Sequence, residues 1–545
     1  MRGVNEASHH PEPQAPPSAG GAQSRELYPS VVAGIGGAVF GAGVNLVCLP
    51  GPAGWLSPLL AMVGLGLALR SLRSAATVRR GALLGAAAYL CAAAVGLFWM
   101  RCITVPAYVG IVLYIAIYGL AFGALIVPVR RNVPAWLFPW MAAALWVALE
   151  WVRSWAFTGF PWMLAGSVWA GLPLAMGPAD LGGVHLVGFL TVLVPALIVA
   201  RRPERRWVRA AIAATVIFLS MGYGWARLGP SRPASPVTRP DVLRIAAVQP
   251  LVPFKVGPHA NRDKMLGEQL QLSAQLEPGT ADLLVWSETM VPGDLAEQAG
   301  ALMAPLAREK RCCFLAGGVI HEGKAESGEW TGRSWNSAVL VSPEGGTPGR
   351  YDKRHLVPFG EFVPFGGHFP GSDHVFRLIG TVFTPGDEHP LAAVGDAPVA
   401  VNICYEDCFP YLARHDARRG ARLMVNLTND SWFRQSAEAR QHLALASFRA
   451  VETRTPLVRA TNTGISALID ADGRITQPPE GGLWKKGLVR MEVAVAASPR
   501  GTIFVTVGDA FAWLCAAAAF VVVAAGFFRR RRKAAAGAVP DEGDG

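Results

Sequence analysis

The sequence has few charged residues for its length. Lys, Arg, Asp and Glu together make up 16% of the 545 residues. Apolar residues make up 52%, counted as Ala, Val, Ile, Leu, Met, Phe, Trp, Tyr and Cys. Soluble globular domains carry about 25% charged residues. The scarcity of charge excludes an ordinary soluble protein and favours a membrane protein with a soluble part. The length favours two or more structural units.

The sequence also lacks the patterns of cofactor-binding proteins. Its eight cysteines show neither metal-ligand spacing nor a disulfide framework, and no P-loop or Rossmann glycine pattern occurs. We therefore expect no metal, no nucleotide and no other cofactor. Cys404 and Cys408 lie near other reactive residue types, and we expect Cys408 to be a packing residue.

Apolar runs are what the sequence has in abundance. A helix needs about 20 apolar residues to cross a bilayer. The runs predict about eight transmembrane helices, seven before a long polar stretch and one after it, and the second run is the shortest. They lie near 29–48, 55–70, 81–100, 107–128, 134–153, 182–200, 207–225 and 508–528.

Basic residues cluster in short runs beside these apolar segments. The net charge of +11 could indicate a nucleic-acid partner, but this placement favours membrane topology, so we expect no nucleic acid. Loops after the second, fourth and sixth runs carry most of the basic residues, as does the carboxyl-terminal tail. The positive-inside rule then predicts both termini in the cytoplasm and the polar stretch on the outer face. The residues are Arg70, Arg73, Arg79, Arg80, Arg130, Arg131, Arg201, Arg202, Arg205, Arg206 and Arg529–Lys533.

The domain organisation follows from these patterns. Residues 1–27 are rich in Pro, Ser, Gly and Ala and lack periodicity, and the first apolar run begins only after them, which is not typical of a signal peptide. The predicted order is a disordered cytoplasmic tail (1–27), seven transmembrane helices (28–228), a linker (229–240), a catalytic domain (241–500), a last transmembrane helix (507–528) and a basic cytoplasmic tail (529–545).

The polar stretch alternates strand-like and helix-like segments, which predicts an α/β domain. Such folds place their chemistry at strand ends. Strands are expected near 243–249, 282–286, 312–319, 337–342, 399–403, 423–426, 457–461, 465–470 and 488–493, and helices near 261–276, 294–310 and 438–453.

Three segments of this domain carry reactive side chains. Glu288 ends the strand-like run that begins at Val285, Lys353 follows Tyr351-Asp352, and Cys404 ends the run that begins at Asn402. Taken singly, each is more often a turn, surface or packing residue. Together they supply what a thiol nucleophile needs, because a base must remove its proton and a cation must stabilise the negative charge that develops.

The order Glu, Lys, Cys, each after a strand-like run, resembles the nitrilase superfamily, which has a Glu–Lys–Cys triad on an αββα sandwich. With the membrane segments on either side, residues 30–530 are similar to the apolipoprotein N-acyltransferase family. The motifs that carry the resemblance are Thr158–Trp162, Ala246–Gln249, Leu356–Phe365, Ile403–Glu406, Asn426–Phe433 and Arg459–Gly464. The fold it implies is a multi-pass α-helical membrane domain plus an extracytoplasmic α/β nitrilase-like αββα sandwich.

The resemblance also implies roles for individual residues. Cys404 would be the nucleophile, Glu288 the general base and Lys353 the group that stabilises the oxyanion. Supporting positions would be Glu361, Tyr405, with its backbone N–H, and Glu406. Substrate-binding positions would be Phe160, Trp162, Phe362 and Trp432, and the loop 356–365 would act as a lid.

The reaction implied is a ping-pong acyl transfer in the bacterial inner membrane, with the catalytic domain on the periplasmic side. A phospholipid such as phosphatidylethanolamine would give an acyl chain to Cys404. The acceptor would be the N-terminal α-amine of an S-diacylglyceryl-cysteine apolipoprotein. We expect a monomer that contacts both lipid substrates from within the bilayer.

Two departures from the family pattern bear on substrate preference. Asp407-Cys408 stands where a more apolar pair is expected, and Ala437–His442 lacks a Gly-Pro-like start. Two alternatives stay open from the residues alone. A membrane-tethered nitrilase-type amidase would share the triad, and a catalytically silent membrane scaffold would share the fold.

Overall fold

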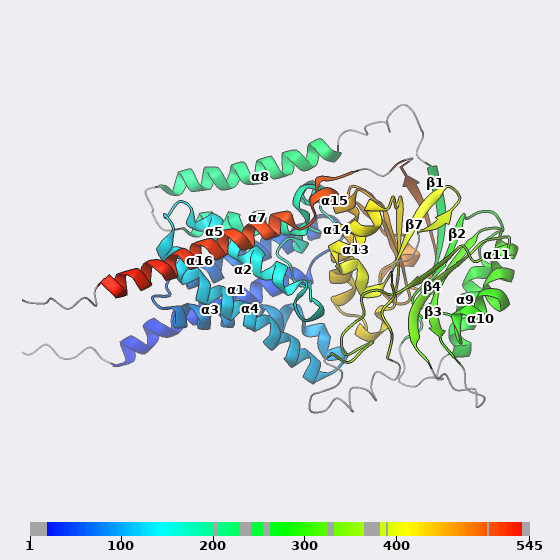
Figure 1. Ribbon diagram of the computed structural model, residues 1–545, viewed down its shortest axis with the longest axis horizontal. Coiled ribbons are helices and arrows are strands. Elements are labelled where there is room, and N and C mark those ends of the chain that lie inside the picture. Colours follow the sequence, from blue (N-terminus) through cyan, green and yellow to red (C-terminus); the bar gives the residue numbers. More distant parts are fainter. Residues whose placement is uncertain are drawn as a thin grey trace, which may run out of the picture.

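The computed structural model describes residues 19–200, 205–228, 241–253, 262–323, 332–364, 382–387, 391–496, 498 and 501–536. A helical half and an α/β half lie next to each other along the long axis of the molecule (Figure 1). The first and last long helices, far apart in the sequence, lie in the same bundle. The predicted linker 229–240 and the outer parts of both predicted tails lie outside the described residues.

The helical half contains one helix for each predicted apolar run. These are α1 (Ala19–Asn45), α2 (Leu56–Leu72), α3 (Val78–Gly96), α4 (Val105–Asn132), α5 (Phe138–Arg153), α7 (Ala179–Val199), α8 (Arg206–Leu228) and α16 (Ala510–Ala536). Within the described part of the chain, six helices are long and apolar enough to cross a membrane, and α1 and α5 are not among them. The predicted count of about eight crossing helices is therefore not confirmed. Helix α1 begins at Ala19, inside the stretch expected to be a disordered tail.

Glycine allows the helices of this half to pack closely. A Cβ on Gly37 of α1 would lie 1.8 Å from the carbonyl oxygen of Ala88 in α3, and one on Gly81 would lie 2.3 Å from that of Gly123 in α4. Any larger residue at these positions would push the backbones apart. Small residues at helix contacts are typical of membrane bundles, because lipid tails supply no hydrophobic force between helices.

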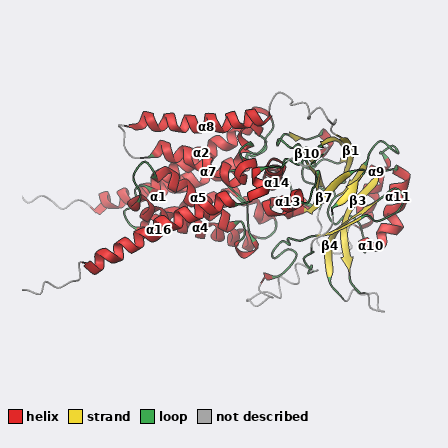
Figure 2. Ribbon diagram, turned by 45° about the horizontal axis from the view of Figure 1, so that its top comes forward, coloured by secondary structure: helices red, strands yellow, loops and turns green. Residues whose placement is uncertain are grey.

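Helix α8 lies along the edge of the bundle (Figures 1 and 2). Its Trp207, Phe218 and Trp225 are exposed, as expected for a helix that faces lipid. Near its carboxyl end it meets the bundle closely, because the backbone of Gly224 lies against Leu174 and Arg227 pairs with buried Asp180.

The α/β half is built on two six-stranded sheets (Figure 2). In the first sheet β1, β2 and β3 run parallel, and in the second β7, β8 and β9 do. The first sheet has the order β12 (Gly487–Val495), β1 (Asp241–Gln249), β2 (Leu283–Trp286), β3 (Cys313–His321), β4 (Ser334–Val341), β5 (Gly349–Asp352). The second has the order β11 (Ile475–Thr476), β10 (Ala467–Ile469), β9 (Leu457–Thr461), β8 (Leu423–Thr428), β7 (Ala397–Ile403), β6 (Ala392–Val394).

The two sheets pack face to face through apolar side chains such as Val285, Val401 and Leu427. Helices α9 (Arg262–Ala274), α10 (Leu295–Gln298) and α11 (Ala304–Lys310) cover the outer face of the first sheet. Helices α13 (Pro410–Arg418) and α14 (Glu438–Thr453) cover the outer face of the second. The layers are those of an αββα sandwich. The predicted fold class, a multi-pass helical part joined to such a sandwich, is confirmed.

Helix α14 joins the two halves. One side packs on the second sheet and the other meets the membrane bundle, including α7 (Figure 1). Every residue of α14 except Arg440 is buried. A helix on a protein surface would keep one polar face in water, so the polar side chains of α14 must find their partners inside the protein.

Candidate active site

The three predicted reactive residues follow three strands whose ends meet. Glu288 comes just after β2, Lys353 directly after β5 and Cys404 directly after β7. Cys404 begins the 3-10 turn η8 (Cys404–Cys408) and has φ of 52°, in the left-handed region that costs a residue with a Cβ some strain. A side chain at such a turn is presented away from the strand that carries it.

Lys353 lies at the centre of the site. Its Nζ donates to Glu361 Oε1 at 2.8 Å and to Glu288 Oε1 at 3.3 Å. The side-chain amide of Asn336 donates to the same two oxygen atoms, at 2.8 Å each. Glu288 and the Cys404 thiol lie close enough for each to shift the pKa of the other. The structure thus brings buried Glu288, Lys353 and Glu361 together with Cys404, which is half-buried.

The environment sets the protonation of these groups. Burial, together with Glu361, raises the pKa of Glu288, although Lys353 opposes the shift. Burial would lower the pKa of Lys353, but the carboxylates of Glu361 and Glu288 hold it well above its usual value. Burial and Glu288 raise the pKa of Cys404 strongly, against the opposing charge of Lys353. At rest the lysine is charged and the thiol keeps its proton, so a reaction at Cys404 needs a base.

Glu406 holds the nucleophile turn in place. Its Oε2 accepts hydrogen bonds from the Ile403 N–H and the Tyr351 hydroxyl, both at 2.7 Å. Its Oε1 accepts from the backbone N–H groups of Arg354, at 2.7 Å, and His355, at 3.0 Å. These four bonds tie the turn at Cys404 to the segment that follows Lys353. Glu406 therefore supports the site through the backbone.

Tyr405 joins the turn to a loop of the membrane half. Its hydroxyl donates to the carbonyl oxygen of Gly159 at 3.0 Å. Its ring stacks on Trp162, with centroids 6.0 Å apart, and Trp162 stacks on Phe160 at 5.9 Å. Gly159 has φ of 89°, and a Cβ there would lie 2.3 Å from the Ser154 carbonyl oxygen. The loop at 158–163 thus reaches the nucleophile in a shape that requires glycine.

Two buried charged residues of α5 hold this loop from the membrane side. Arg153 donates from NH1 to the carbonyl oxygens of Phe160 and Trp162. Glu150 Oε1 accepts from Trp146 Nε1 and from the Ala165 N–H, both at 2.8 Å. Ion-bearing side chains are costly within a membrane bundle. These two residues fix the backbone of the loop that contacts Tyr405, the residue after Cys404.

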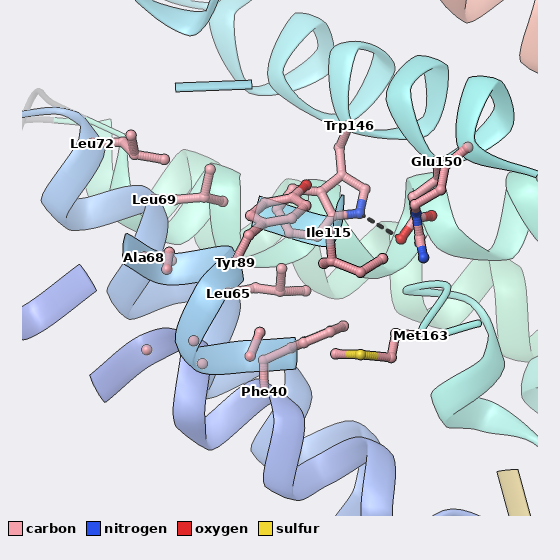
Figure 3. A pocket seen from close by; sticks show the side chains of 16 residues that line it. Phe40, Leu65, Ala68, Leu69, Leu72, Tyr89, Ile115, Trp146, Glu150 and Met163 are labelled. Carbon is pink, nitrogen blue, oxygen red and sulfur yellow. Dashed lines mark hydrogen bonds between the residues drawn. The ribbon is translucent and has the colours of Figure 1, made fainter. Parts of the chain in front are cut away.

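A small cavity adjoins these residues within the bundle (Figure 3). Its volume is about 30 Å³, and Tyr89, Trp146, Glu150 and Met163 contribute to its wall. Among the described residues, the Tyr89 hydroxyl and Glu150 Oε2 have no hydrogen-bond partner. A cavity of this volume has room for one or two water molecules and not for an acyl chain.

The predicted binding residues differ in how much of their surface is exposed. Trp162 is buried, with 4% of its surface exposed, whereas Trp432 is 46% exposed. Phe362 is half-buried in the loop after Lys353, and its carbonyl oxygen accepts from the Phe359 N–H at 2.8 Å. The predicted lid 356–365 is described as far as Pro364, and Phe365 lies outside the described residues.

Asn336 and Gln441 belong to the site and its support but are absent from the sequence-based prediction. The predicted strand began at Ser337, one residue too late to include Asn336. Gln441 Oε1 accepts from the indoles of Trp162, at 2.7 Å, and Trp99, at 3.1 Å. A polar residue inside an apolar strand or helix was the signal that could have found both, because buried polar groups need partners.

Two families of known sequences match separate parts of the chain. Residues 244–500 match the carbon-nitrogen hydrolase family, and residues 42–197 match the apolipoprotein N-acyltransferase N-terminal domain. A solved carbon-nitrogen hydrolase from Helicobacter pylori G27 aligns with 46% of this chain and 89% of its own, at 17% identity and a TM-score of 0.35. The fold and the site define a carbon-nitrogen hydrolase domain carried by a membrane bundle.

Two relatives narrow the assignment. Apolipoprotein N-acyltransferase of Geobacter metallireducens is 34% identical over 68% of this chain and 71% of its own length. That of Azotobacter vinelandii is 34% identical over 78% of this chain and 82% of its own. The chain belongs to the apolipoprotein N-acyltransferase family. It is an acyltransferase enzyme of the nitrilase superfamily and a membrane protein.

Proposed function

We propose that this protein transfers an acyl chain from a phospholipid, through a thioester on Cys404, to the N-terminal α-amine of S-diacylglyceryl-cysteine apolipoproteins. The lipoprotein substrate is supported by the names of its relatives. The observation that carries the chemistry is the ion pair of Glu288 with Lys353 Nζ, at 3.3 Å, beside the Cys404 thiol, on which both charges act. All these groups come from one chain, and we propose that it acts as a monomer.

The first half-reaction starts from the protonated thiol. Glu288 accepts the proton as the sulfur attacks the sn-1 ester carbonyl carbon of the phospholipid, for which we propose phosphatidylethanolamine. The ammonium of Lys353 stabilises the oxyanion of the tetrahedral intermediate, together with the backbone N–H of Tyr405. The carbon–oxygen bond then breaks, and Glu288 returns the proton to the lysophospholipid oxygen. Cys404 is left as a thioester.

The second half-reaction runs through the same groups. The neutral α-amine attacks the thioester carbonyl carbon, and Glu288 accepts a proton from the nitrogen. The carbon–sulfur bond breaks, the amide is released, and Glu288 returns the proton to the sulfur. Glu361 has no transfer step in this scheme. Its hydrogen bond to Lys353 Nζ keeps the lysine charged and aimed at the site.

The position of the site beside the membrane half supports lipid substrates. Each CH₂ moved into water costs about 0.8 kcal/mol, so a long acyl chain does not leave the bilayer readily. The Tyr405 hydroxyl contacts Gly159 in a loop of the helical half. This contact supports a position of the Cys404 turn at the boundary between the sandwich and the bundle. We propose that Phe160, Trp162, Phe362 and Trp432 contact the lipid there, that the loop from Leu356 closes over the thioester, and that the sandwich faces the periplasm.

The intact mass of the full-length protein, incubated with phosphatidylethanolamine vesicles, tests the proposal. We expect one added acyl group on Cys404 and its loss when a diacylglyceryl lipopeptide is added. Cys404→Ala should abolish both events, and Cys404→Ser should leave at most a trace. Cys408→Ala is the matched control, since it removes the neighbouring thiol and should keep the adduct.

Two outcomes would contradict the proposal. An acyl group mapped to any residue other than Cys404 would move the site. Release of the acyl group to water, equally fast with and without the lipopeptide amine, would favour the amidase alternative.

A further inference from the structure

Beneath the nucleophile turn lies a closed ring of four charged side chains, which we call the charge ring. Asp407 belongs to η8, Asp430 follows β8, His442 lies on α14 and Arg459 on β9. His442 Nε2 lies 2.9 Å from Asp407 Oδ1, and His442 Nδ1 lies 3.1 Å from Asp430 Oδ1. Arg459 NH1 contacts Asp407, and Arg459 NH2 lies 3.8 Å from Asp430 Oδ2. None of the four side chains is more than 2% exposed.

The geometry fixes the protonation of His442. Each ring nitrogen lies within 3.1 Å of a carboxylate oxygen, and Nδ1 is hydrogen-bonded to Asp430, whereas the contact of Nε2 with Asp407 is an ion-pair distance only. Two carboxylates this close stabilise the protonated ring over the neutral one. Both nitrogens therefore carry a proton, and His442 is an imidazolium. The charge ring then holds two positive and two negative charges in alternation, which is how buried charges are tolerated.

The groups that face His442 agree with this state. Burial lowers the pKa of His442, but Asp407, Cys408 and Asp430 raise it well above its usual value, against the charge of Arg459. Burial and neighbouring carboxylates raise the pKa of Glu438 well above its usual value, so it faces His442 as a neutral acid. From the membrane half, the uncharged ring of Trp162 packs on the imidazole. In the described part of the chain, the titratable or charged groups that interact with His442 include Asp407, Cys408, Asp430, Glu438, Arg459, Cys404 and Tyr405.

The charge ring reaches the nucleophile in two ways. Asp407 lies three residues after Cys404 in the same 3-10 turn, so whatever holds Asp407 holds the turn. The charge of His442 also acts directly, because it lowers the pKa of the Cys404 thiol whereas Asp430 raises it. Without the imidazolium, the carboxylate of Asp430 would oppose formation of a thiolate at Cys404 with less compensation.

We propose that His442 is a positioning residue that works as a permanent imidazolium. It holds the turn of Cys404 through Asp407 and stabilises the thiolate that forms as Glu288 takes the proton. The inference rests on the proposed role of Cys404 as nucleophile and adds a second cation, besides Lys353, that acts on its sulfur.

A bound metal ion is the competing explanation for this cluster. Asp407, Cys408 and His442 each offer a ligand atom, and these atoms lie within 4.8 Å of one another. A metal would need an unprotonated ring nitrogen, but two carboxylates within 3.1 Å of the His442 nitrogens favour the protonated ring, and Arg459 already neutralises Asp407. The contacts favour the imidazolium.

The pH dependence of Cys404 alkylation by iodoacetamide tests the inference in the full-length protein in detergent. Fragment-ion mass spectrometry distinguishes Cys404 from Cys408. In His442→Gln we expect the midpoint of alkylation to move to higher pH. Below the midpoint the rate should fall about tenfold for each pH unit of the shift.

A second variant gives a shift of opposite sign. Asp430→Asn removes a charge that raises the pKa of Cys404, while Asp407 and Cys408 still hold the proton on His442. Its alkylation midpoint should therefore move to lower pH. Loss of packing alone could not shift the two variants in opposite directions. Asp180→Asn is the control, because it removes a buried, ion-paired carboxylate in the membrane half and should leave the midpoint in place.

The inference fails if the midpoint of His442→Gln equals that of the wild type, even where its melting temperature is lower. If that variant does not fold, an unchanged midpoint in Asp430→Asn has the same meaning. One equivalent of zinc in the purified protein, lost in His442→Gln, would also overturn it. Alkylation needs no acyl transfer, so these outcomes are independent of whether the protein acylates a lipopeptide.

Discussion

At the scale of single residues, the site depends on two carboxylates that share their partners, because Glu288 and Glu361 each accept from Lys353 and from Asn336. The sequence predicts that Glu288, Lys353 and Cys404 form one site, because each follows an apolar run and strand ends converge in an α/β fold. Asn336 could not be predicted in the same way. Its amide is needed only because Glu288 and Glu361 both turn one oxygen toward the same point, and that convergence exists only in the folded chain.

Replacement of Asn336 by Ala should shift the pH dependence of acyl-enzyme formation. The Asn336 amide lowers the pKa of Glu288, which burial raises. Without the amide the pKa of Glu288 rises further, so more of this base is protonated near neutral pH. We expect the acidic limb of the rate profile to move to higher pH, with a loss of about tenfold in rate at a fixed pH on that limb for each unit of the shift.

Mass spectrometry of the acyl-enzyme between pH 5 and 9 provides the measurement for Asn336→Ala. Ser337→Ala is the matched control, since Ser337 is the next residue of β4 and its hydroxyl donates to Asp352 at 2.6 Å. A profile of Asn336→Ala that keeps its shape and only loses amplitude would mean that the amide does not act on Glu288.

Among the elements, α14 was predicted with its correct ends but with only part of its environment. Leu443, Ala446 and Val451 recur at helical spacing and predict one buried face. The polar side chains of Gln441 and Glu452 are buried as well, because the membrane bundle covers them through hydrogen bonds with Gly96 and Val184. Hydrophobic periodicity predicts the contact of α14 with the sheet. It cannot predict the contact with the membrane bundle, because that contact is made through hydrogen bonds.

Gln441→Glu should destabilise the contact between the two halves. The Gln441 amide nitrogen donates to Asn45 Oδ1 at 2.8 Å and to the Gly96 carbonyl oxygen at 2.9 Å. A carboxylate there turns two hydrogen bonds into repulsion between oxygens, while the indoles of Trp99 and Trp162 keep an acceptor. An unsatisfied buried group costs about 1–3 kcal/mol, so the melting temperature in detergent should fall by several degrees. Arg440→Gln, at the preceding position, is the control and should have the melting temperature of the wild type.

At the scale of the whole molecule, the distribution of basic residues predicts the side of the membrane on which the sandwich lies. The basic residues lie in alternate loops, and that alternation assigns one side of the membrane to the sandwich. The structure adds that an ionic network crosses the boundary, because Arg454 pairs with Asp180 of α7 and with Asp472 of the sandwich. These ion pairs hold the sandwich in one orientation on the bundle. The side of the membrane that the basic loops face therefore determines the side on which the acyl transfer occurs.

Labelling of single introduced cysteines tests this orientation. Arg474→Cys places a thiol at an exposed position of the sandwich, and Trp136→Cys places one in the loop between α4 and α5. A membrane-impermeant maleimide, added to cells with a permeabilised outer membrane, should label position 474 and should reach position 136 only after the inner membrane is opened. The parent chain, whose eight cysteines are unchanged, gives the background. Labelling in the reverse order would place the sandwich in the cytoplasm, where the proposed lipoprotein amine and the thioester would lie on opposite sides of the membrane.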